Sequence, residues 1–539
     1  MKLLKKLLPI VLVLTFVLAL VPMTFTVSAD TWDGTSVATG FESGDGSEAN
    51  PYIIKNAAQF AFLAKSVNGG EAGAGHVTYE GKFIKLEADI NLNNVQWVPI
   101  GNSTKDADGN VCSFNGTFDG NNHTISGLYF NEADKGWPTT DVGLFGRIKY
   151  ATIKNLMVFG SEISGARYAG GLVGRMTHGS SVINCYVKID NISGEAVGGV
   201  VGRSQDKSDS LSATYLRNVI LLCEFEGLQV LGDNKRIGNT AYAGGIIGVA
   251  GDTDIRYCVN NADVHLEAKG AGSNAGGIIG CHGASGGTVL VDHCINVGNI
   301  SHTEKGTIGG VVGKANHVEG GGTNYNINLG TITTDGSTFL VGALVGNFAK
   351  NAGVAGYHHN VSVKSGENIF LEGSDDGTQS PVSYAAVNDD FYLDKRSCLF
   401  VEGTTVKVAD LIGYSSEYWT DGEKHPEPKK DAILAKVLGD LTWRELAVAE
   451  TPETTKPEET TQAPDTSAPE VTTEAKKETT KTPDTAKKPD ESVKPQGTNP
   501  PASTETPNSS GGCGSVVASS LALIAAISLA GVVIAKKKD

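Results

Sequence analysis

A short apolar stretch between glycines recurs seven times along the middle of the chain. It reads GLFG at residues 143–146 and GGLVG at 170–174, and five later copies keep Val, Ile or Leu at the centre. The glycines that close the stretches are Gly146, Gly174, Gly202, Gly248, Gly280, Gly313 and Gly346, spaced by 28, 28, 46, 32, 33 and 33 residues. This period predicts a solenoid, in which each repeat is one layer stacked on the previous one.

Each repeat carries a second apolar run midway between two glycine corners, for example VINCYVKI at 182–189 and VDHCINVGNI at 291–300. These runs are short, so each repeat predicts two or three brief strands and no amphipathic helix. Because no hairpin signal separates them, equivalent strands should pair in parallel, one layer every ~4.8 Å. The expected fold is an all-β, right-handed parallel β-helix. Its closing glycines are expected at corners where φ is positive.

A second column supports stacking. Aligning the middle strands of the repeats puts small apolar or amide side chains at equivalent positions: Leu156, Cys185, Cys223, Cys258, Cys294, Asn326 and Asn360. Cysteine packs in such a column as a small hydrophobe, and asparagine can pair its amide with the layers above and below. The sequence therefore predicts that this column points into the core.

The repeats resemble the GLUG motif of bacterial surface proteins. The resemblance extends to the preceding segments GDGSEANPYIIKNAAQFAFLAKSVNGG (44–70) and FNGTFDGNNHTISGL (114–128), and covers residues 32–350. It implies a pectin-lyase-like coil in a secreted protein attached to the cell wall or membrane, here the plasma membrane of a Gram-positive bacterium. The resemblance implies location and fold more than activity.

The remaining segments divide the chain into regions. Residues 1–29 predict a signal peptide, and residues 30–139 an N-terminal cap and the first coils, with a helix capped by Asn56. The repeats fill 140–365, and 366–448 is expected to be a C-terminal cap or small subdomain. Residues 449–512 are rich in Thr, Pro, Lys and Glu and predict a disordered stalk. Residues 513–539 predict one transmembrane helix and a basic cytoplasmic tail.

Composition narrows the function classes. The net charge is −16, and no basic patch with interleaved aromatics occurs, so nucleic acid is not expected as a partner. The eight cysteines show no zinc-binding spacing. No HExxH, GxSxG or P-loop motif occurs.

The candidate binding residues lie in loops, because insertions in solenoids emerge on one side, often the binding side. The long third interval predicts a recognition patch of Asp206, Asp209, Lys235 and Arg236, with length drift as the alternative interpretation. Trp137, in the polar loop before the first repeat, is the candidate exposed aromatic side chain.

One loop resembles a calcium site. Asp106, Asp108 and Asn110 have the spacing of a calcium loop, but Val111 stands where glycine is expected and no terminal glutamate follows. A polar surface loop is the alternative. Ca²⁺ is the only cofactor that the sequence indicates.

No catalytic constellation is apparent. Hydrolysis of glycosides needs two converging carboxyl groups, and Asp141 aligns with Ala169, Val197 and Ala243 rather than with further acids. The Arg147-Ile148-Lys149 triplet matches a motif of polygalacturonases out of its usual order. The expected role is therefore non-catalytic binding or adhesion at the cell surface, to a surface glycan or protein. The alternatives are an extracellular polysaccharide lyase or glycoside hydrolase on the same fold, and a structural spacer. A cluster of acids with Arg or Lys in a groove would favour the enzyme.

Overall fold

The structure is a computed structural model. It describes residues 30–440 with gaps at 71–72, 74, 107, 133–139, 206–216, 234–239, 269–271, 283–287, 304–305, 316–320, 335–339, 350–359, 364–378, 383, 386–396, 402–404 and 412. The predicted signal peptide, stalk and membrane span lie outside the described residues. Within the described part of the chain, no helix combines the length and apolar character needed to cross a bilayer.

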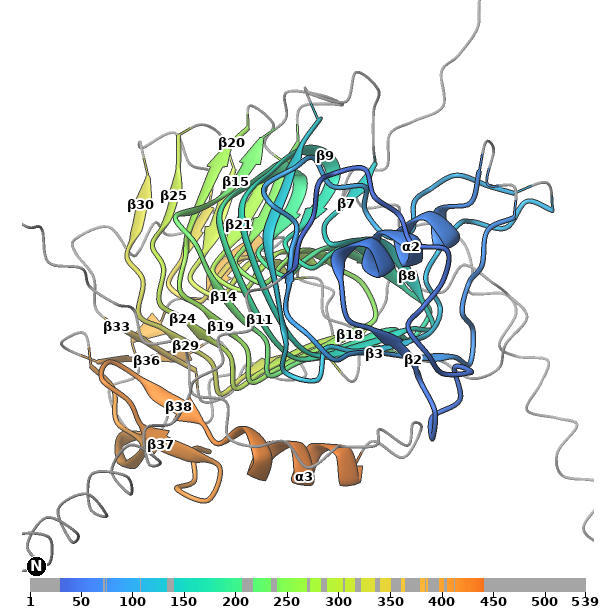
Figure 1. Ribbon diagram of the computed structural model, residues 1–539. Helices are drawn as coiled ribbons and strands as arrows, with labels where there is room; N and C mark the ends of the chain where they lie inside the picture. Colours follow the sequence, from blue (N-terminus) through green and yellow to red (C-terminus); the bar gives the residue numbers. More distant parts are fainter. Residues whose placement is uncertain are drawn as a thin grey trace, which may run out of the picture. The chain divides into compact units, whose positions relative to one another are not determined.

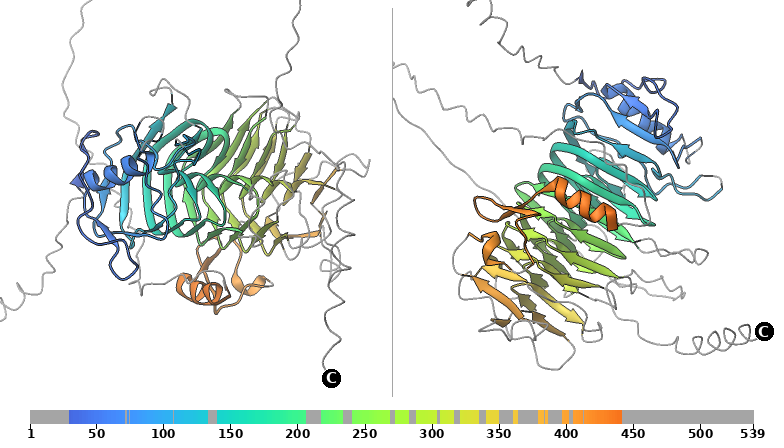
Figure 2. Two further views of the ribbon diagram at one scale, coloured as in Figure 1. Left: turned by 90° about the vertical axis from the view of Figure 1, so that its right-hand side faces the viewer. Right: turned by 90° about the horizontal axis from the view of Figure 1, so that it is seen from below.

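The strands form a parallel β-solenoid, as the period predicts. Most belong to a 28-stranded sheet that winds around the coil, and an 8-stranded sheet closes the remaining side. Every pairing between the coils is parallel, while β34 joins β32 antiparallel and β37 pairs with β38. Figures 1 and 2 show the strands stacked in rows, each strand beside its equivalent in the next coil.

One coil contains five short strands rather than the predicted two or three. In the coil that starts at β17 these are β17 to β21, and each pairs with its equivalent among β22 to β26. The apolar run of a repeat is split into separate strands by bends, which the hydrophobic pattern alone does not mark. The repeat strands are β8 (Phe145–Lys149), β9 (Thr152–Gly170), β10 (Val173–Thr177), β11 (Ser181–Gly198), β12 (Val201–Gln205), β13 (Asn218–Leu221), β14 (Glu224–Glu226), β15 (Gln229–Asp233), β16 (Tyr242–Gly244), β17 (Ile247–Ala250), β18 (Thr253–Arg256), β19 (Val259–Asn260), β20 (Asp263–Glu267), β21 (Asn274–Gly276), β22 (Ile279–His282), β23 (Val289–Asp292), β24 (Ile295–Asn296), β25 (Ile300–His302), β26 (Thr307–Gly309), β27 (Val312–Ala315), β28 (Gly322–Asn324), β29 (Ile327–Asn328), β30 (Ile332–Thr334), β31 (Leu340–Gly342) and β32 (Val345–Ala349).

The closing glycines have a different role from the one predicted. All seven lie within the strands of the 8-stranded sheet, and none has positive φ. A Cβ on Gly174 would lie 2.4 Å from the backbone nitrogen of Val142, and one on Gly280 would lie 2.7 Å from that of Ala243. Glycine is therefore required because two backbones approach closely where the chain turns into the next sheet.

Positive φ occurs instead in a column of non-glycine residues. These residues immediately precede the predicted inward column, and they are Asn155, Asn184, Leu222, Tyr257, His293 and Tyr325, with φ between 51° and 55°. Asn155 and Asn184 lie within β9 and β11, whereas Leu222, Tyr257, His293 and Tyr325 lie between two short strands. This left-handed conformation is uncommon outside glycine, asparagine and aspartate, so the sequence alone does not indicate it at Leu222 or Tyr257.

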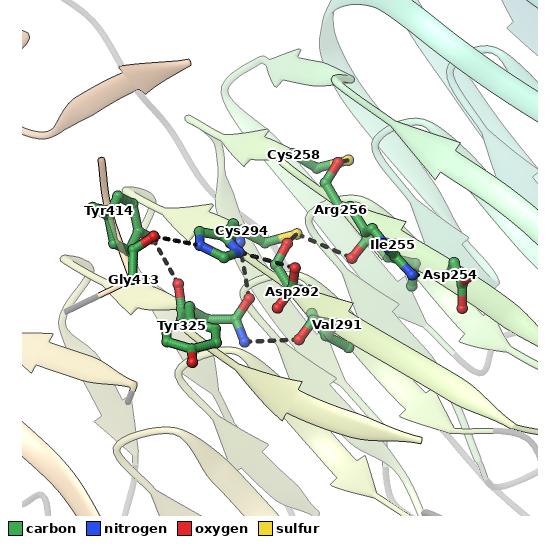
Figure 3. Close-up of polar contacts among 12 residues, drawn as sticks. Asp254, Ile255, Arg256, Cys258, Val291, Asp292, Cys294, Tyr325, Gly413 and Tyr414 are labelled. Carbon is green, nitrogen blue, oxygen red and sulfur yellow. Dashed lines mark hydrogen bonds and ion pairs between the residues drawn. The ribbon is translucent and has the colours of Figure 1, made fainter. Parts of the chain in front are cut away.

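The predicted inward column is confirmed. Cys185 pairs with Leu156 in register, and Cys185, Cys223, Cys258 and Cys294 are all buried as free thiols. The Asn326 side chain accepts a hydrogen bond from the Cys294 backbone N–H at 2.9 Å and donates one to Asn360 at 3.0 Å. Figure 3 shows part of this column beside β18 and β23.

A second amide column was not predicted. Asn260 donates to Asn296 at 2.8 Å, Asn296 donates to Asn328 at 2.9 Å, and Asn328 donates to the Ser362 hydroxyl at 3.3 Å. All four side chains are buried, so each amide finds its partner in the next coil.

The N-terminal region contains the predicted helix. Helix α2 (Ala57–Asn68) begins after Asn56, whose side chain accepts from the Gln59 backbone N–H. Its buried face joins the core of the first coils, where the Phe60 ring stacks on Trp97 with 5.2 Å between centroids. The other elements before the repeats are β1 (Asp30–Thr31), β2 (Tyr52–Ile54), β3 (Phe83–Leu86), β4 (Ile90–Asn91), β5 (Thr117–Asp119), β6 (Thr124–Asn131) and β7 (Asp141–Val142).

The C-terminal region lies beside the coil where the structure describes it. Residues 405–411 and 413–440, here the side segment, contain η4 (Val408–Asp410), β37 (Trp419–Asp421), β38 (Pro426–Pro428) and α3 (Lys430–Asp440). Their apolar side chains form one cluster with Tyr257, Ile295 and Ile327 from successive coils. Figure 2 shows this segment along the flank of the stack. The prediction of a C-terminal cap or small subdomain over 366–448 is not confirmed, and much of 366–404 lies outside the described residues. The remaining strands are β33 (Val361–Val363), β34 (Gln379–Val382), β35 (Tyr384–Ala385) and β36 (Ser397–Val401).

Candidate functional site

Three arginines occupy the same position in three successive coils. Arg147 on β8 pairs in register with Arg175 on β10, which pairs with Arg203 on β12. Successive coils are about 4.8 Å apart, so the three guanidinium groups follow one line over about 10 Å. Val249 and Cys281 continue the column in the next two coils and interrupt the row of charges, and Lys314 follows them in the next coil. We call Arg147, Arg175 and Arg203 the arginine ladder.

The Tyr168 ring supports the ladder. Arg203 donates from Nη1 to the Tyr168 hydroxyl at 3.0 Å, and the guanidinium carbons of Arg175 and Arg203 lie 5.3 and 5.1 Å from the ring centroid. Arg167 contacts the same ring from its own strand at 5.3 Å. The ring is only 6% exposed, so the arginines cover it and gain cation–π attraction in a partly dry setting.

Two acidic side chains lie among the arginines. Asp141 Oδ2 is 3.7 Å from Arg147 Nη1, and the Asp141 side chain has no solvent exposure. Burial raises the pKa of Asp141, and the charges of Arg175 and Arg147 oppose that rise. Glu195 Oε1 lies 3.8 Å from Arg167 Nε. Burial raises the pKa of Glu195, and the positive charge of Arg167 opposes that rise. The ladder is thus only partly neutralised by its own acids.

The central arginine is the most constrained group of the ladder. Burial, and after it the charge of Arg147, lowers the pKa of Arg175 to about 10, so Arg175 still carries its charge at neutral pH. The Nε groups of Arg167, Arg175 and Arg203 have no acceptor among the described residues. Among the described residues, four guanidinium groups lie beside two carboxylates, which leaves excess positive charge and unused donors in a protein whose net charge is −16. This arrangement suits an anionic ligand.

Sequence reasoning did not recognise the arginine ladder, and it misplaced Asp141 by one residue. Asp141 pairs with Tyr168, not with Ala169 as the aligned glycines predict. The first corner has Gly143 alone where the second has Gly170 and Gly171, so strands on either side of it are offset by one residue. The available signal was the arginine that directly follows each of the first three closing glycines.

The predicted recognition patch is not tested by the structure. Asp206, Asp209, Lys235, Arg236 and Trp137 all lie outside the described residues. Residues 206–216 follow β12 directly in the sequence, and 234–239 follow β15. The patch therefore stays a prediction.

The predicted calcium loop is a hydrogen-bonded turn. Asp106 Oδ1 accepts from the backbone N–H groups of Asp108 at 3.0 Å and Asn110 at 2.7 Å, and Oδ2 lies 3.4 Å from His76 Nδ1. Burial tends to raise the Asp106 pKa, but these hydrogen bonds and His76 hold it below its usual value. Among the described residues, no three His, Cys, Asp or Glu side chains converge as metal ligands. Calcium binding here remains a prediction.

Comparison with known proteins agrees with the repeat analysis. Residues 165–193, which hold Arg167, Tyr168 and Arg175, match the family model described as the GLUG motif. The chain is therefore a β-solenoid that carries a GLUG motif. A protein of Evansella cellulosilytica, provisionally named a Gly-rich membrane protein, is 29% identical over 184 residues, which is 34% of this chain and 19% of that relative.

Two solved structures resemble the chain. One, provisionally named an immunoglobulin A1 protease from Bacteroides ovatus, has a TM-score of 0.39 and 19% identity, covering 72% of this chain and 95% of that one. The other, named IgA1 Protease, has a TM-score of 0.37 and 16% identity, covering 59% of this chain and 22% of that one. Similarity at this level carries no argument about activity.

Proposed function

We propose that the protein is a cell-surface binding protein, non-catalytic, which displays the solenoid outside the cell and contacts its ligand through the arginine ladder. The observation that carries this proposal is the in-register row of Arg147, Arg175 and Arg203, beside which the described residues place two carboxylates in ion pairs with arginines. A row of like charges in neighbouring coils is destabilising for the fold itself. Its presence is more easily understood if the row serves recognition.

Surface display is supported by the two ends of the sequence. An export signal at 1–29, a polar stalk at 449–512 and an apolar segment followed by three lysines at 513–539 would place the solenoid outside and the tail inside. The relative with 29% identity is itself named a membrane protein.

The ladder lacks the paired acids of a glycoside hydrolase. Such enzymes need two carboxyl groups that both reach the substrate. The Asp141 side chain is completely buried, and only Glu195, at 16% side-chain exposure, reaches solvent. Asp141 is therefore better explained as an internal counter-charge for Arg147.

A carbohydrate lyase is the second candidate, and one observation favours it. The Tyr168 hydroxyl lies beside Arg203, with Arg167 and Arg175 around the ring. Arginines that neutralise a substrate carboxylate, with a hydroxyl as general acid or base, could support proton abstraction. The shielding of Tyr168, only 6% exposed, weighs against this role.

The proposal is tested with cells that display the full chain. Their adhesion to immobilised glycans and to other cells is compared with that of cells displaying the triple variant Arg147→Gln, Arg175→Gln, Arg203→Gln at equal surface amount. We expect the native chain to bind and the variant to lose most of the binding. Equal adhesion by both, no adhesion by either, or release of unsaturated sugars by the native chain would contradict the proposal, the last in favour of the lyase.

A further inference from the structure

We propose that the arginine ladder binds a linear acidic polysaccharide that lies along the coil axis, with one anionic group on each of Arg147, Arg175 and Arg203. This inference rests on the proposed function and names the ligand class of the same site. Its starting point is the register, which places the three arginines at the same position of consecutive paired strands, with the Tyr168 ring against Arg175 and Arg203.

The spacing of the ladder favours a polymer with regularly repeated charges. The rungs are separated by about 4.8 Å, the distance between paired strands. A glycan built from uronic acids carries one carboxylate on every ring, and an extended chain of such rings advances by a comparable step. Each guanidinium can hold a carboxylate through two parallel N–H···O bonds, which a single lysine ammonium cannot do.

The unbroken run of charges in this column is three residues long. The column continues from Arg203 to Val249 and Cys281, which are both buried and uncharged, before Lys314 follows in the next coil. The binding energy should therefore increase with each added sugar up to three charged units and change little over the two neutral coils that follow. A diffuse electrostatic patch would show no such limit.

Nucleic acid fits the site less well. Single-stranded nucleic acid is usually held by bases stacked on exposed aromatic rings. The one aromatic ring at the ladder, Tyr168, is buried under its arginines.

The acids of the site would orient the ladder rather than bind the ligand. Asp141 pairs with Arg147 from the interior, and Glu195 pairs with Arg167 beside Tyr168. Among the described residues, neither Arg175 nor Arg203 forms an ion pair within 4.0 Å, whereas Arg147 pairs with Asp141. Arg175 also lies between the other two arginines of the ladder, so an anion bound to it relieves repulsion from both sides. The central arginine should therefore contribute most to binding.

The experiment is calorimetric titration of the purified full chain with galacturonic acid dimer, trimer, tetramer and hexamer, and with their methyl esters as neutral controls. We expect affinity to rise from dimer to trimer and then to level off, to weaken with added salt, and to vanish for the esters. Arg175→Gln should weaken trimer binding by at least about tenfold, because one charge-assisted bidentate contact is lost. Arg175→Lys should recover only part of this loss.

Arg256→Gln is the matched control, because Arg256 is an arginine of another face of the coil that pairs with Asp254 at 3.3 Å. It should leave trimer binding unchanged, and the melting temperature of each variant shows whether it is folded. Equal binding of esters and acids, or an unaffected Arg175→Gln variant that melts like the native chain, would overturn the inference. If cells displaying the chain still adhere through the ladder while no acidic oligomer binds, the inference fails and the proposed function survives. If adhesion is absent as well, both fail.

Discussion

The His293 ring contacts the carbonyl oxygen of Gly413, with 3.1 Å between Nε2 and the oxygen, although 120 residues separate them. The other ring nitrogen, Nδ1, lies 2.9 Å from Asp292 Oδ2. Both ring nitrogens therefore face an oxygen atom, one from the coil and one from the C-terminal segment. The ring also stacks between Tyr257 and Tyr325 of the adjacent coils (Figure 3 shows the surrounding contacts).

This contact predicts that His293 holds the side segment onto the coil. His293→Ala removes the hydrogen bond to Gly413 and the ring that packs against Tyr414 and Trp419. We expect the local opening free energy of residues 405–440 to fall by about 1–3 kcal/mol. Amide hydrogen exchange in that segment should accelerate by roughly ten- to a hundredfold.

His265→Ala is the control for this prediction, because the contacts of His265 among the described residues lie within the coil, to the Ser301 hydroxyl at 2.7 Å and to Glu267 at 4.0 Å. It should leave exchange in the side segment unchanged. If His293→Ala also leaves that exchange unchanged, the side segment is held by its apolar contacts alone.

The close backbone approach at the glycine corner predicts a sharp difference between two glycine substitutions. Gly280→Ala puts a methyl group 2.7 Å from the Ala243 nitrogen and the Gly248 oxygen, so the neighbouring coils must shift. We expect a loss of about 2 kcal/mol or more in the free energy of unfolding, measured by urea denaturation. Gly40→Ala is the control, since a Cβ there meets no atom within 4 Å. Similar midpoints of urea denaturation for the two variants would show that close backbone approach is not the reason for glycine at position 280.

The buried amide column predicts a strong effect at Asn296. Asn296→Ala removes the partners of Asn260 and Asn328 and leaves their amides without those bonds in a dry column. The free energy of unfolding should fall by roughly 2–4 kcal/mol, because buried polar groups lose hydrogen-bond partners. Asn299→Ala, in the exposed contact with Asp263 and Thr331, should have a much smaller effect. Equal losses would mean that burial of the column is unimportant.

The pKa of Asp141 predicts how stability depends on pH at the ladder. Burial raises this pKa above 3.8, so the folded chain favours the protonated acid more than the unfolded chain does. That contribution is present below the unfolded pKa and is lost as pH rises through the higher folded pKa. Asp141→Asn cannot ionise and should avoid the loss.

Melting temperatures of the native chain and Asp141→Asn, followed from acid to neutral pH, test this sign. The melting temperature of the variant should rise relative to that of the native chain as the pH rises. If the melting temperature of the native chain rises relative to that of the variant instead, the attraction of Arg147 and Arg175 has a larger effect on the Asp141 pKa than burial has.

The sequence by itself determined the parts of this protein that depend on local pattern. The glycine period predicts coils stacked in parallel, the Cys and Asn column predicts an inward row, and Asn56 marks the start of α2. These features repeat at nearly constant spacing, so a stacked fold must bring them together.

Only the tertiary structure decided the candidate site and the place of the side segment. The pairing of Asp141 with Tyr168 depends on a one-residue difference at the first corner, which shifts the register between coils. The contact of Gly413 with His293 depends on how a C-terminal segment packs beside the coil. Neither relationship repeats along the chain. Packing selects both, because burial of the side segment and the close fit of backbones at the corner are satisfied only in three dimensions.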